Sequence, residues 1–298
     1  MFISEQAVFI LGIVFGIASA LGIIAFFLAR RDHKSKRDFL IESYSADYCE
    51  ELGFAYGDGF MSEGGTAAVD KLVEGIDLAG KTVLDFGSGM GGMALHLARA
   101  HRAKVIGIEI NERMVAEAHA RIPFNQKSLI QFMISNQDGS LPLADNSVDV
   151  VLSKGVIVHL TLAEREQAYA EFFRVLKPGG ALVVNDLLSR ISGVWSAQIE
   201  RLIETESLPL YAQTVDEYAR LIESNGFEKP YFIDETAEYA DCNRALREHL
   251  EDSGVQKKFI DRFGEESWRE HRQGYGDIHD SFARREAIIG TFRSHKPF

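Results

Sequence analysis

A glycine-rich segment, "VLDFGSGMGGMALHLA" from Val83 to Ala98, constrains the fold of this chain more than any other part. It places four glycines within six positions, between an apolar run and a stretch with helical spacing. Glycine weakens both strands and helices, so such a cluster needs a specific reason. Gly87, Gly89 and Gly92 fit the spacing G-x-G-x-x-G, which lets a backbone turn tightly and approach a ligand. The segment therefore predicts a ligand-binding turn between a strand and a helix.

Apolar runs with the length of strands alternate with helical periodicity as far as about Leu188. A repeat of this kind is typical of a parallel sheet covered on both faces, and right-handed crossovers make it doubly wound. We therefore predict an α/β fold with a doubly wound, mostly parallel sheet that binds ligands at the carboxyl ends of its strands. The predicted strands are "KTVLDF", "AKVIGIEI", "SLIQFMIS", "VDVVLS" and "ALVVNDLL", and the predicted helices are "GMALHLARAH", "NERMVAEAHAR" and "LAEREQAYAEFFRVL".

The pattern is looser after Leu188. "TVDEYARLIESNGF" predicts a helix that begins after a cap at Thr214 and ends at Asn225 and Gly226. "YFIDE" is consistent with one further strand. Residues 236–289 read as mostly helical and strongly charged, and their pattern alone assigns them no chemistry.

The N-terminal part of the chain reads as a membrane anchor. Residues 7–29 contain no charged side chain, and a helix of this length spans roughly 34 Å, enough for the hydrocarbon core of a bilayer. A cleaved signal peptide, the main alternative, normally carries its positive charges before a shorter apolar core. Here the basic run "RRDHKSKR" follows the apolar segment, which favours a retained helix with the remainder in the cytoplasm. We predict a single-pass membrane protein with a transmembrane helix at 7–29, a basic linker at 30–38 and one domain at 39–298 whose C-terminal region is helical.

Composition narrows the classes of function. The net charge of −12 makes binding to nucleic acid by charge alone unfavourable, so we expect no nucleic-acid partner. The two cysteines, Cys49 and Cys242, are too few for a disulfide framework or a Cys-rich zinc site, and we expect no metal. Three histidines, His96, His101 and His119, fall on predicted helices and are expected to face solvent.

Acidic residues lie beside the predicted turn and at the ends of neighbouring strands. Asp85 precedes Gly87 by two positions, and Glu109 ends the next strand, where a carboxylate can accept hydrogen bonds from a ribose diol. A dinucleotide would set its pyrophosphate on this turn, where a nearby acid is unfavourable. S-adenosylmethionine carries a sulfonium and an ammonium but no phosphate, so acidic neighbours suit it better. Asp138, after a further strand, is placed to accept a hydrogen bond from adenine; capping of a turn is the alternative role for Asp85 and Asp138.

Four of these segments, "VLDFGSGMGG", "VIGIEI", "QDGSLPLADNSVDVVLS" and "LKPGG", resemble the motifs of class I methyltransferases in the same order and at similar spacing. The resemblance implies the Rossmann-like fold of that family, S-adenosyl-L-methionine as cofactor, and an enzyme that transfers methyl groups. Carried over by position, the cofactor contacts would be Asp85, Gly87, Ser88, Gly89, Glu109, Ile110, Asp138, Gly139 and Lys154.

A closer resemblance, to the phosphoethanolamine methyltransferases, covers nearly all of the chain after the linker. It rests on "FMSEGG", "GSGMGG", "SKGVIVHL", "TVDEYARLIESNGF" and "GTFRSHKP". It implies that Met61 and Ser62 contact the cofactor and that Tyr44 forms a lid and a dyad with His159, the active-site histidine. Tyr48, one helical turn away, is an alternative to Tyr44. Taking a proton from an amine nucleophile suits histidine, whose ordinary pKa lies near neutrality.

The substrate side of the resemblance is altered at four positions. Gly155 stands where the family has an acidic residue, and Leu187 where it has a tyrosine. Leu208 and Leu210 stand roughly where the family has the arginine and tyrosine that hold the phosphate of the substrate. Burying a phosphate without such donors is unfavourable. The leading hypothesis is a membrane-anchored methyltransferase of a small amine or a lipid head group, with His159 as base. The alternatives are C- or O-methylation of an isoprenoid or sterol-like lipid, a non-catalytic cofactor-binding regulatory module, and a nicotinamide-dependent dehydrogenase.

Overall fold

The computed structural model describes residues 36–298 and divides between Glu42 and Ser43 into two compact units. In the first unit it describes helix α2 (Lys36–Ser43), so the end of the predicted basic linker is helical instead. Asp38 lies in the first turn of α2, where a carboxylate stabilises a helix. The predicted transmembrane helix, residues 7–29, lies outside the described residues. Between residues 36 and 298, no helix combines the length and the apolar character needed to cross a bilayer.

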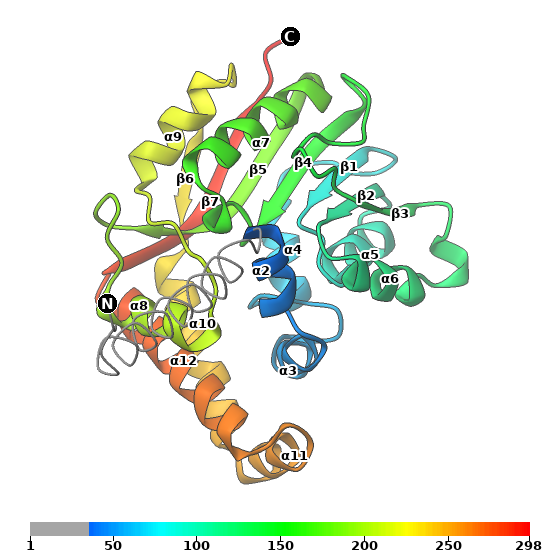
Figure 1. Cartoon of the computed structure of the whole chain (residues 1–298). Helices are drawn as coiled ribbons and strands as arrows, with labels where there is room; N and C mark the ends of the chain where they lie inside the picture. Colours follow the sequence, from blue (N-terminus) through cyan, green and yellow to red (C-terminus); the bar gives the residue numbers. More distant parts are fainter. Residues whose placement is uncertain (1–35) are drawn as a thin grey trace, which may run out of the picture. The chain divides into compact units, whose positions relative to one another are not determined.

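A seven-stranded sheet forms the centre of the second unit, with the order β3-β2-β1-β4-β5-β7-β6 (Figure 1). The strands from β1 to β5 are parallel, and β7 runs antiparallel to both of its neighbours. The predicted α/β fold with a mostly parallel sheet is therefore confirmed. The strands are β1 (Thr82–Phe86), β2 (Lys104–Glu109), β3 (Ile130–Ile134), β4 (Val148–Lys154), β5 (Leu176–Ser189), β6 (Tyr231–Asp234) and β7 (Ala287–His295).

Helices follow most of the strands, as the alternating sequence pattern predicts. Two of them, α7 and α9, begin with capping boxes at Thr161 and Thr214, where each threonine and the glutamate three residues later satisfy each other's backbone N–H groups. The cap predicted at Thr214 is thus confirmed. The helices are α3 (Ala46–Tyr56), α4 (Gly65–Leu72), α5 (Gly92–Ala100), α6 (Glu112–Arg121), α7 (Leu162–Val175), α8 (Ala197–Glu206), α9 (Val215–Ser224), α10 (Thr236–Glu251), α11 (Ser253–Phe263) and α12 (Glu265–Ala283), with short 3-10 helices η1 (Phe124–Gln126) and η2 (Ile157–His159).

Alternating side chains along the strands build two apolar cores, one on each face of the sheet. Val83 and Val150 belong to the core that includes α4, α5 and α6. Leu84 and Val151, their neighbours in the chain, belong to the core that includes α7 and α9. Because both faces of the sheet are buried, its strands read as nearly continuous apolar runs.

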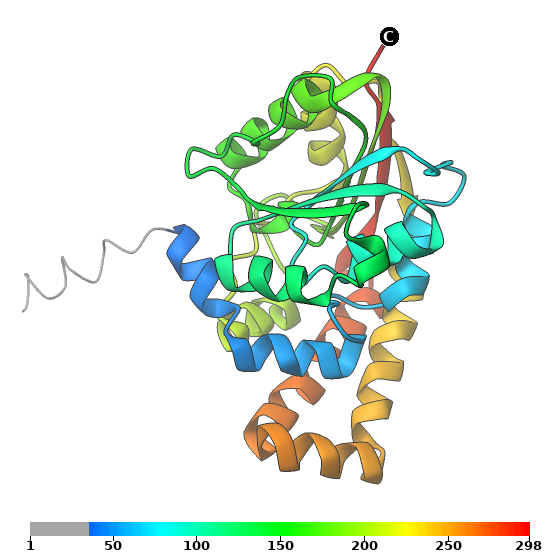
Figure 2. The same cartoon turned by 90° about the vertical axis from the view of Figure 1, so that its right-hand side faces the viewer.

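The carboxyl ends of the parallel strands meet at one edge of the sheet, and further helices gather there. Figures 1 and 2 show α10, α11 and α12, coloured yellow to orange, projecting from this edge. These helices pack against α3 through an aromatic cluster in which the rings of Phe54 and Phe259 lie 5.3 Å apart in a T-shaped contact. The region that the sequence left without assigned chemistry therefore covers the edge where ligands are expected.

The prediction that three histidines face solvent is wrong for one of them. His119 on α6 is exposed, as predicted. His96 on α5 is only 8% exposed, because α4 packs over that face of α5 and places Asp70 against the imidazole. His101, just after α5, is partly covered by the same aspartate.

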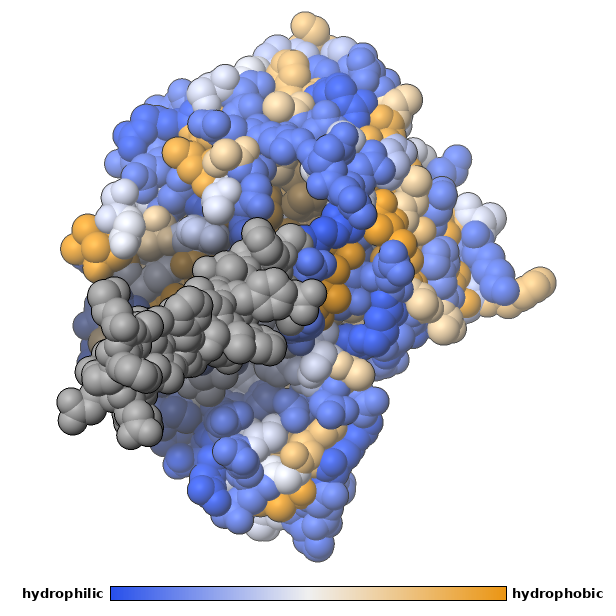
Figure 3. Space-filling model, viewed as in Figure 1, coloured by the Kyte–Doolittle hydropathy of each residue, from blue (hydrophilic) through white to orange (hydrophobic). Residues whose placement is uncertain are grey.

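The surface is mostly hydrophilic on the face shown in Figure 3, as expected for a strongly charged chain. Hydrophobic residues appear there as separate patches. The most exposed large apolar side chains of the described residues come from different elements, including Phe124 on η1, Leu162 on α7 and Tyr231 on β6. Scattered apolar residues of this kind are normal on a globular protein.

Candidate active site

The glycine-rich segment forms a turn between β1 and α5, so the predicted strand–turn–helix is confirmed. Gly87 has φ = 78°, and a Cβ atom there would lie 2.3 Å from Cγ2 of Val156. At Gly92 a Cβ atom would lie 2.6 Å from the carbonyl oxygen of Gly59, to which the Gly92 N–H donates a hydrogen bond of 3.0 Å. The glycines thus allow the side chain of Val156 and the backbone of Gly59 to approach the turn closely.

A pocket with about 430 Å³ of space opens beside this turn. The turn supplies one wall, and the loop before α4 supplies the other. Gly89, with φ = 50°, lies against Met61, because a Cβ atom on Gly89 would be 2.9 Å from Cγ of that methionine. Seven of the predicted cofactor residues line the pocket: Met61, Ser62, Asp85, Gly87, Ser88, Gly89 and Lys154.

Asp85 is a buried carboxylate that lines this pocket. Neither of its oxygens has a hydrogen-bond partner among residues 36–298. Burial, together with the nearby carboxylate of Glu109, raises the pKa of Asp85 to about 7. Leaving such a group unsatisfied costs about 1–3 kcal/mol or more. A ligand ammonium would supply both the hydrogen bonds and the charge that Asp85 lacks, so the site fits the amino group of S-adenosylmethionine.

Glu109, at the end of β2, holds the turn in place. Its Oε2 accepts a hydrogen bond of 3.0 Å from the N–H of Gly89, and its Oε1 accepts from the N–H groups of Ile110 and Asn111 at 2.7 and 3.0 Å. Carboxylate oxygens accept more than one hydrogen bond, so these contacts leave room for the predicted bonds to a ribose diol. The structure brings Glu109 to the turn, and the Ile110 N–H donates to Glu109; their contacts with a cofactor stay a prediction.

Asp138 and Gly139 are not among the residues that line this pocket. The Asp138 carboxylate accepts hydrogen bonds from the N–H and the hydroxyl of Ser140, at 3.0 and 2.7 Å. These bonds lower the pKa of Asp138. This is the turn-capping role that the sequence left open, and a contact with adenine stays a prediction.

Lys154, the last residue of β4, stands between the cofactor pocket and a second cavity and lines both. Its Nζ donates hydrogen bonds to Oγ of Ser62 at 2.7 Å and to the carbonyl oxygen of Glu63 at 3.1 Å, and lies 5.6 Å from the ring centre of Tyr239. Burial lowers the pKa of Lys154, and the nearby Glu63 opposes that shift. Lys154 therefore ties the loop before α4 to the sheet.

The second cavity is the larger one, with about 930 Å³ of empty space including its open mouth. Its walls include residues of α3, α8 and α12. Lys154 is the one lysine or arginine among the described residues that line it. The four positions at which the sequence departs from the phosphoethanolamine methyltransferases all line this cavity: Gly155, Leu187, Leu208 and Leu210.

His159 and Tyr44 meet in this cavity. The Tyr44 hydroxyl lies 3.4 Å from Nε2 of His159, and the rings form an edge-to-face contact. Nδ1 of His159 lies 3.0 Å from the carbonyl oxygen of Pro209. Because a carbonyl only accepts, Nδ1 carries the proton and Nε2 presents its lone pair. Burial, followed by the charges of Glu206 and Glu109, raises the pKa of Tyr44, so its hydroxyl stays protonated.

Two buried side chains fix the 3-10 helix η2 that carries His159. Asp186 accepts hydrogen bonds from the Val158 N–H at 2.8 Å and from the Tyr218 hydroxyl at 3.2 Å. Arg165 donates to the carbonyl oxygens of Ile157 and Val158 at 2.9 and 3.2 Å. Burial raises the pKa of Asp186 to about 6, against the opposing effect of Arg165. The backbone of the two residues before His159 is therefore held by groups that themselves are packed in the core.

The sequence analysis missed Glu206, a carboxylate at the end of α8 that lines the cavity. The Tyr48 hydroxyl donates to it at 2.8 Å, so Tyr48 pairs with Glu206 and Tyr44 pairs with His159. Burial raises the pKa of Glu206 to about 7. Glu206 lies in a charged helical stretch, where a carboxylate normally faces water, and no sequence signal distinguishes it. His271, Tyr275 and other residues of α12 that line the cavity were missed for the same reason.

Comparisons with known proteins show which proteins this chain is similar to. Residues 84–184 match the family described as "Methyltransferase domain". The phosphoethanolamine N-methyltransferase of Plasmodium falciparum is 24% identical over 254 residues, which cover 85% of this chain and 93% of that enzyme. Phosphoethanolamine N-methyltransferase 1 of Triticum aestivum is 28% identical over 222 residues, which cover 74% of this chain and 43% of that enzyme. The chain thus spans nearly all of the first relative and less than half of the second.

A solved structure supports the fold. Phosphoethanolamine N-methyltransferase 2 of Haemonchus contortus, in complex with S-adenosyl-L-methionine, superposes with a TM-score of 0.79 at 21% sequence identity. The superposition covers 90% of this chain and 61% of that one. The α/β arrangement that the sequence predicts is therefore the Rossmann-like fold of class I methyltransferases.

Proposed function

Because this chain belongs to the class I, S-adenosylmethionine-dependent methyltransferases, we propose that it methylates the nitrogen of a small amine or of an amine-bearing lipid head group. The observation that carries the proposal is the pairing of Tyr44 and His159 in a cavity that also holds the carboxylate of Glu206. A non-catalytic module would be favoured if Tyr44 and His159 lay far apart, and they are in contact.

S-adenosyl-L-methionine is the cofactor, and it supplies a methyl group on a sulfonium when bound. Asp85 is the residue of this chain that suits its ammonium, because that carboxylate is buried and lacks a partner among the described residues. Glu109 would hold the ribose, and the turn at residues 87–89 would lie against the methionine end. The adenine contacts at Ile110, Asp138 and Gly139 belong to the same proposal.

His159 would act as the general base. An ammonium substrate has no lone pair, so it must lose a proton before its nitrogen can attack a methyl group. Nε2 of His159 presents a lone pair in the cavity, and the bond from Nδ1 to Pro209 holds the ring in that tautomer. The Tyr44 hydroxyl, 3.4 Å from Nε2, orients the ring and excludes water. Its hydrogen must turn away from Nε2 before that nitrogen takes the proton from the substrate nitrogen.

The charged side chains that line the cavity favour a substrate that places an amine, and no phosphate, inside it. Glu206 and Glu63 line it and suit a cation, whereas Lys154 already donates to Ser62 and to a backbone carbonyl. Leu208 stands near the position where the relatives named above would need a phosphate donor, and a phosphate next to it would lose its hydrogen bonds. We therefore place the amine near His159 and Glu206, and an apolar group of the substrate beside the leucines.

A labelling experiment tests the reaction. The full chain is incubated with S-adenosylmethionine carrying an isotopic methyl label and, separately, with ethanolamine, phosphoethanolamine, phosphatidylethanolamine vesicles and an isoprenoid alcohol. We expect the label on nitrogen, with phosphoethanolamine a poorer acceptor than one of the phosphate-free or lipid amines. Preferred methylation of phosphoethanolamine would overturn the argument from the missing phosphate donors.

A second candidate function is methylation of carbon or oxygen in an isoprenoid or sterol-like lipid. The apolar side chains of Leu187, Leu208 and Leu210 in the cavity favour it. The same labelling experiment separates the two functions, because label on carbon or oxygen would replace label on nitrogen.

We also propose that residues 7–29 anchor the protein in a membrane with residues 39–298 in the cytoplasm. The support comes from the uncharged run of 23 residues and from the basic cluster that follows it. Extraction of membranes with alkaline carbonate should leave the chain in the pellet. Release of the chain into the supernatant would contradict the anchor and leave the proposed reaction untouched.

A further inference from the structure

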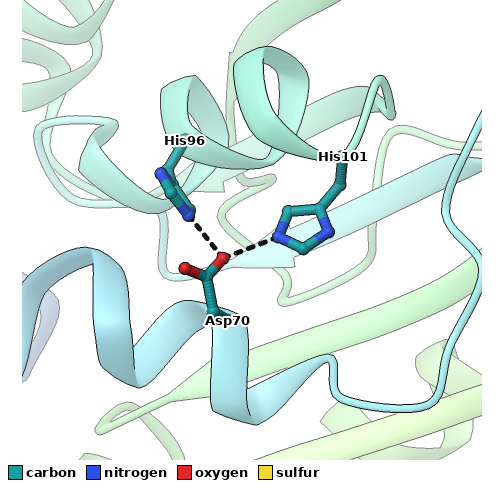
Figure 4. A group of neighbouring side chains, drawn as sticks. All are labelled: Asp70, His96 and His101. Carbon is teal, nitrogen blue, oxygen red and sulfur yellow. Dashed lines mark hydrogen bonds and ion pairs between the residues drawn. The ribbon is translucent and has the colours of Figure 1, made fainter.

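A cluster of two histidines and one aspartate lies outside the active site. Figure 4 shows Asp70, on α4, pointing between the rings of His96 on α5 and His101 at the end of α5. Nε2 of His96 lies 2.6 Å from Oδ1 of Asp70, and Nε2 of His101 lies 2.7 Å from the same oxygen. Within residues 36–298, this is the one group of three such side chains whose ligand atoms all lie within 4.8 Å of one another.

We propose that Asp70, His96 and His101 form a binding site for one divalent cation of the zinc type. Two imidazoles and a carboxylate are the donor set that Zn²⁺ takes when three protein ligands leave a fourth position for water. Nitrogen donors favour Zn²⁺ and the neighbouring late transition metals over Mg²⁺ and Ca²⁺, which require mainly oxygen ligands. The site would join α4 to α5 on the face of the sheet opposite α7 and α9.

The cluster needs little change to accept the ion. Ligand atoms around a tetrahedral Zn²⁺ lie roughly 3.3 Å apart, given bonds of about 2.0–2.1 Å. The two nitrogen–oxygen distances to Asp70 are shorter than this because each is now a hydrogen bond from a histidine N–H to the carboxylate. The Asp70 side chain is 53% exposed and His101 is 26% exposed, so both can move outward, while His96, at 8%, is held in the core.

Binding of the ion requires a change in the protonation of the His96 ring. A metal on Nε2 of His96 moves the ring proton to Nδ1. Nδ1 is buried and has no hydrogen-bond partner in the part of the chain that the structure describes, so the move breaks no bond there but leaves a buried N–H without an acceptor, which weakens binding of the ion.

No pattern in the sequence indicates this site. Its two histidines are five residues apart, and its aspartate comes from another helix, 26 residues before His96. Neither spacing is a recognised metal motif, and the expectation of no metal rested on the small number of cysteines alone. Packing of α4 on α5 creates the cluster.

Zinc titration of the metal-stripped full chain tests the site, with a chromophoric chelator as competitor and no S-adenosylmethionine present. We expect one Zn²⁺ per chain, with affinity lowered more than tenfold in Asp70→Asn and His101→Ala. His249→Ala, which removes an exposed histidine on α10, is the matched control and should bind Zn²⁺ like the parent chain.

Thermal melting serves as the second readout and shows whether each metal-free variant is folded. Zn²⁺ should raise the melting temperature of the parent chain and of His249→Ala but not of His101→Ala, and Mg²⁺ should raise none of them. Equal binding by all four proteins, or no binding by the parent chain, would overturn the site. Either result leaves the proposed methyl transfer unaffected.

Discussion

The cofactor pocket and the substrate cavity share Met61, Ser62, Glu63 and Lys154, yet they are built in different ways. The pocket takes its walls from two short stretches, residues 59–69 and 85–93, together with Lys154. The cavity collects side chains from α3, η2, the end of β5, α8, α12 and β7. The pocket is therefore shaped by local backbone, which is hard to change without losing the turn. The cavity is shaped by separate side chains, which can be exchanged one at a time to suit another substrate.

The buried carboxylates of the pocket and the cavity differ in whether they have a hydrogen-bond partner. Asp85 in the pocket has no partner among the described residues, so its hydrogen bonds must come from a ligand or water. Glu206 in the cavity already accepts a bond from Tyr48. Each carboxylate has a pKa raised to about 7 by burial. Asp85 thus depends on a ligand or water for its hydrogen bonds, whereas Glu206 has a protein partner before the substrate arrives.

The largest expected effect separates chemistry in the cavity from binding in the pocket. His159→Ala should lower kcat by about 10²–10⁴, the usual contribution of a general base. The dissociation constant of S-adenosylmethionine, measured by calorimetry, should stay within about twofold, because His159 does not line the cofactor pocket. His249→Ala is the control. Equal losses of turnover and cofactor affinity would show that His159 is structural.

The second effect tests the unpartnered carboxylate of the pocket. Asp85→Asn keeps the shape of the side chain and removes its charge, so the affinity for S-adenosylmethionine should fall by about 10- to 150-fold, equivalent to 1.5–3 kcal/mol. The parent chain should bind the cofactor more tightly as the pH rises from 6 to 8, because the carboxylate must be ionised to pair with an ammonium. An Asp85→Asn variant with unchanged affinity and unchanged pH dependence would remove Asp85 from the site.

A smaller effect is expected from the carboxylate of the cavity. Glu206→Gln should raise KM for a cationic amine by about tenfold, as for the loss of one charge-assisted hydrogen bond. Cofactor affinity should not change. Tyr48→Phe, which removes only the hydroxyl that Glu206 accepts from, is the matched control for loss of that bond. An unchanged KM in Glu206→Gln would mean that the amine binds elsewhere in the cavity.

The difference between the pocket, built from two short stretches, and the cavity, built from distant elements, also explains which site residues the sequence could predict. The turn at residues 87–92, the strands beside it and the carboxylates at 85 and 109 follow one another in a fixed spacing, so their joint role could be inferred. His159 and Tyr44 were found only through a resemblance, and their contact depends on packing between elements 115 residues apart. Glu206 and the residues of α12 reach the cavity through tertiary packing, which no local pattern encodes. His96 was misjudged for the same reason, since α4 covers the helix face that the sequence placed in solvent.

The smallest expected effect concerns the stability of the chain without its cofactor. Asp85 and Glu206 have pKa values raised to about 7 in the folded chain, from ordinary values of 3.8 and 4.5. Between about pH 4 and 7 the folded chain therefore binds protons that the unfolded chain has released. The stability that each group contributes is complete below its ordinary pKa and is lost as the pH rises through 7, by up to about 1.4 kcal/mol per pH unit.

Asp149 and Asp234 have lowered pKa values, so the stability that they contribute is complete above about pH 4 and does not offset this loss; the parent chain serves as the reference. The effect must therefore be read as a difference between variants. In urea unfolding at pH 5 and pH 8, Asp85→Asn and Glu206→Gln should each gain stability relative to the parent chain at pH 8 more than at pH 5. The gain should be larger for Asp85→Asn, because no hydrogen bond is lost with its charge, whereas Glu206→Gln weakens the bond from Tyr48. Equal gains at both pH values would show that these carboxylates are not held against ionisation, and the distinction between the pocket and the cavity would then rest on geometry alone.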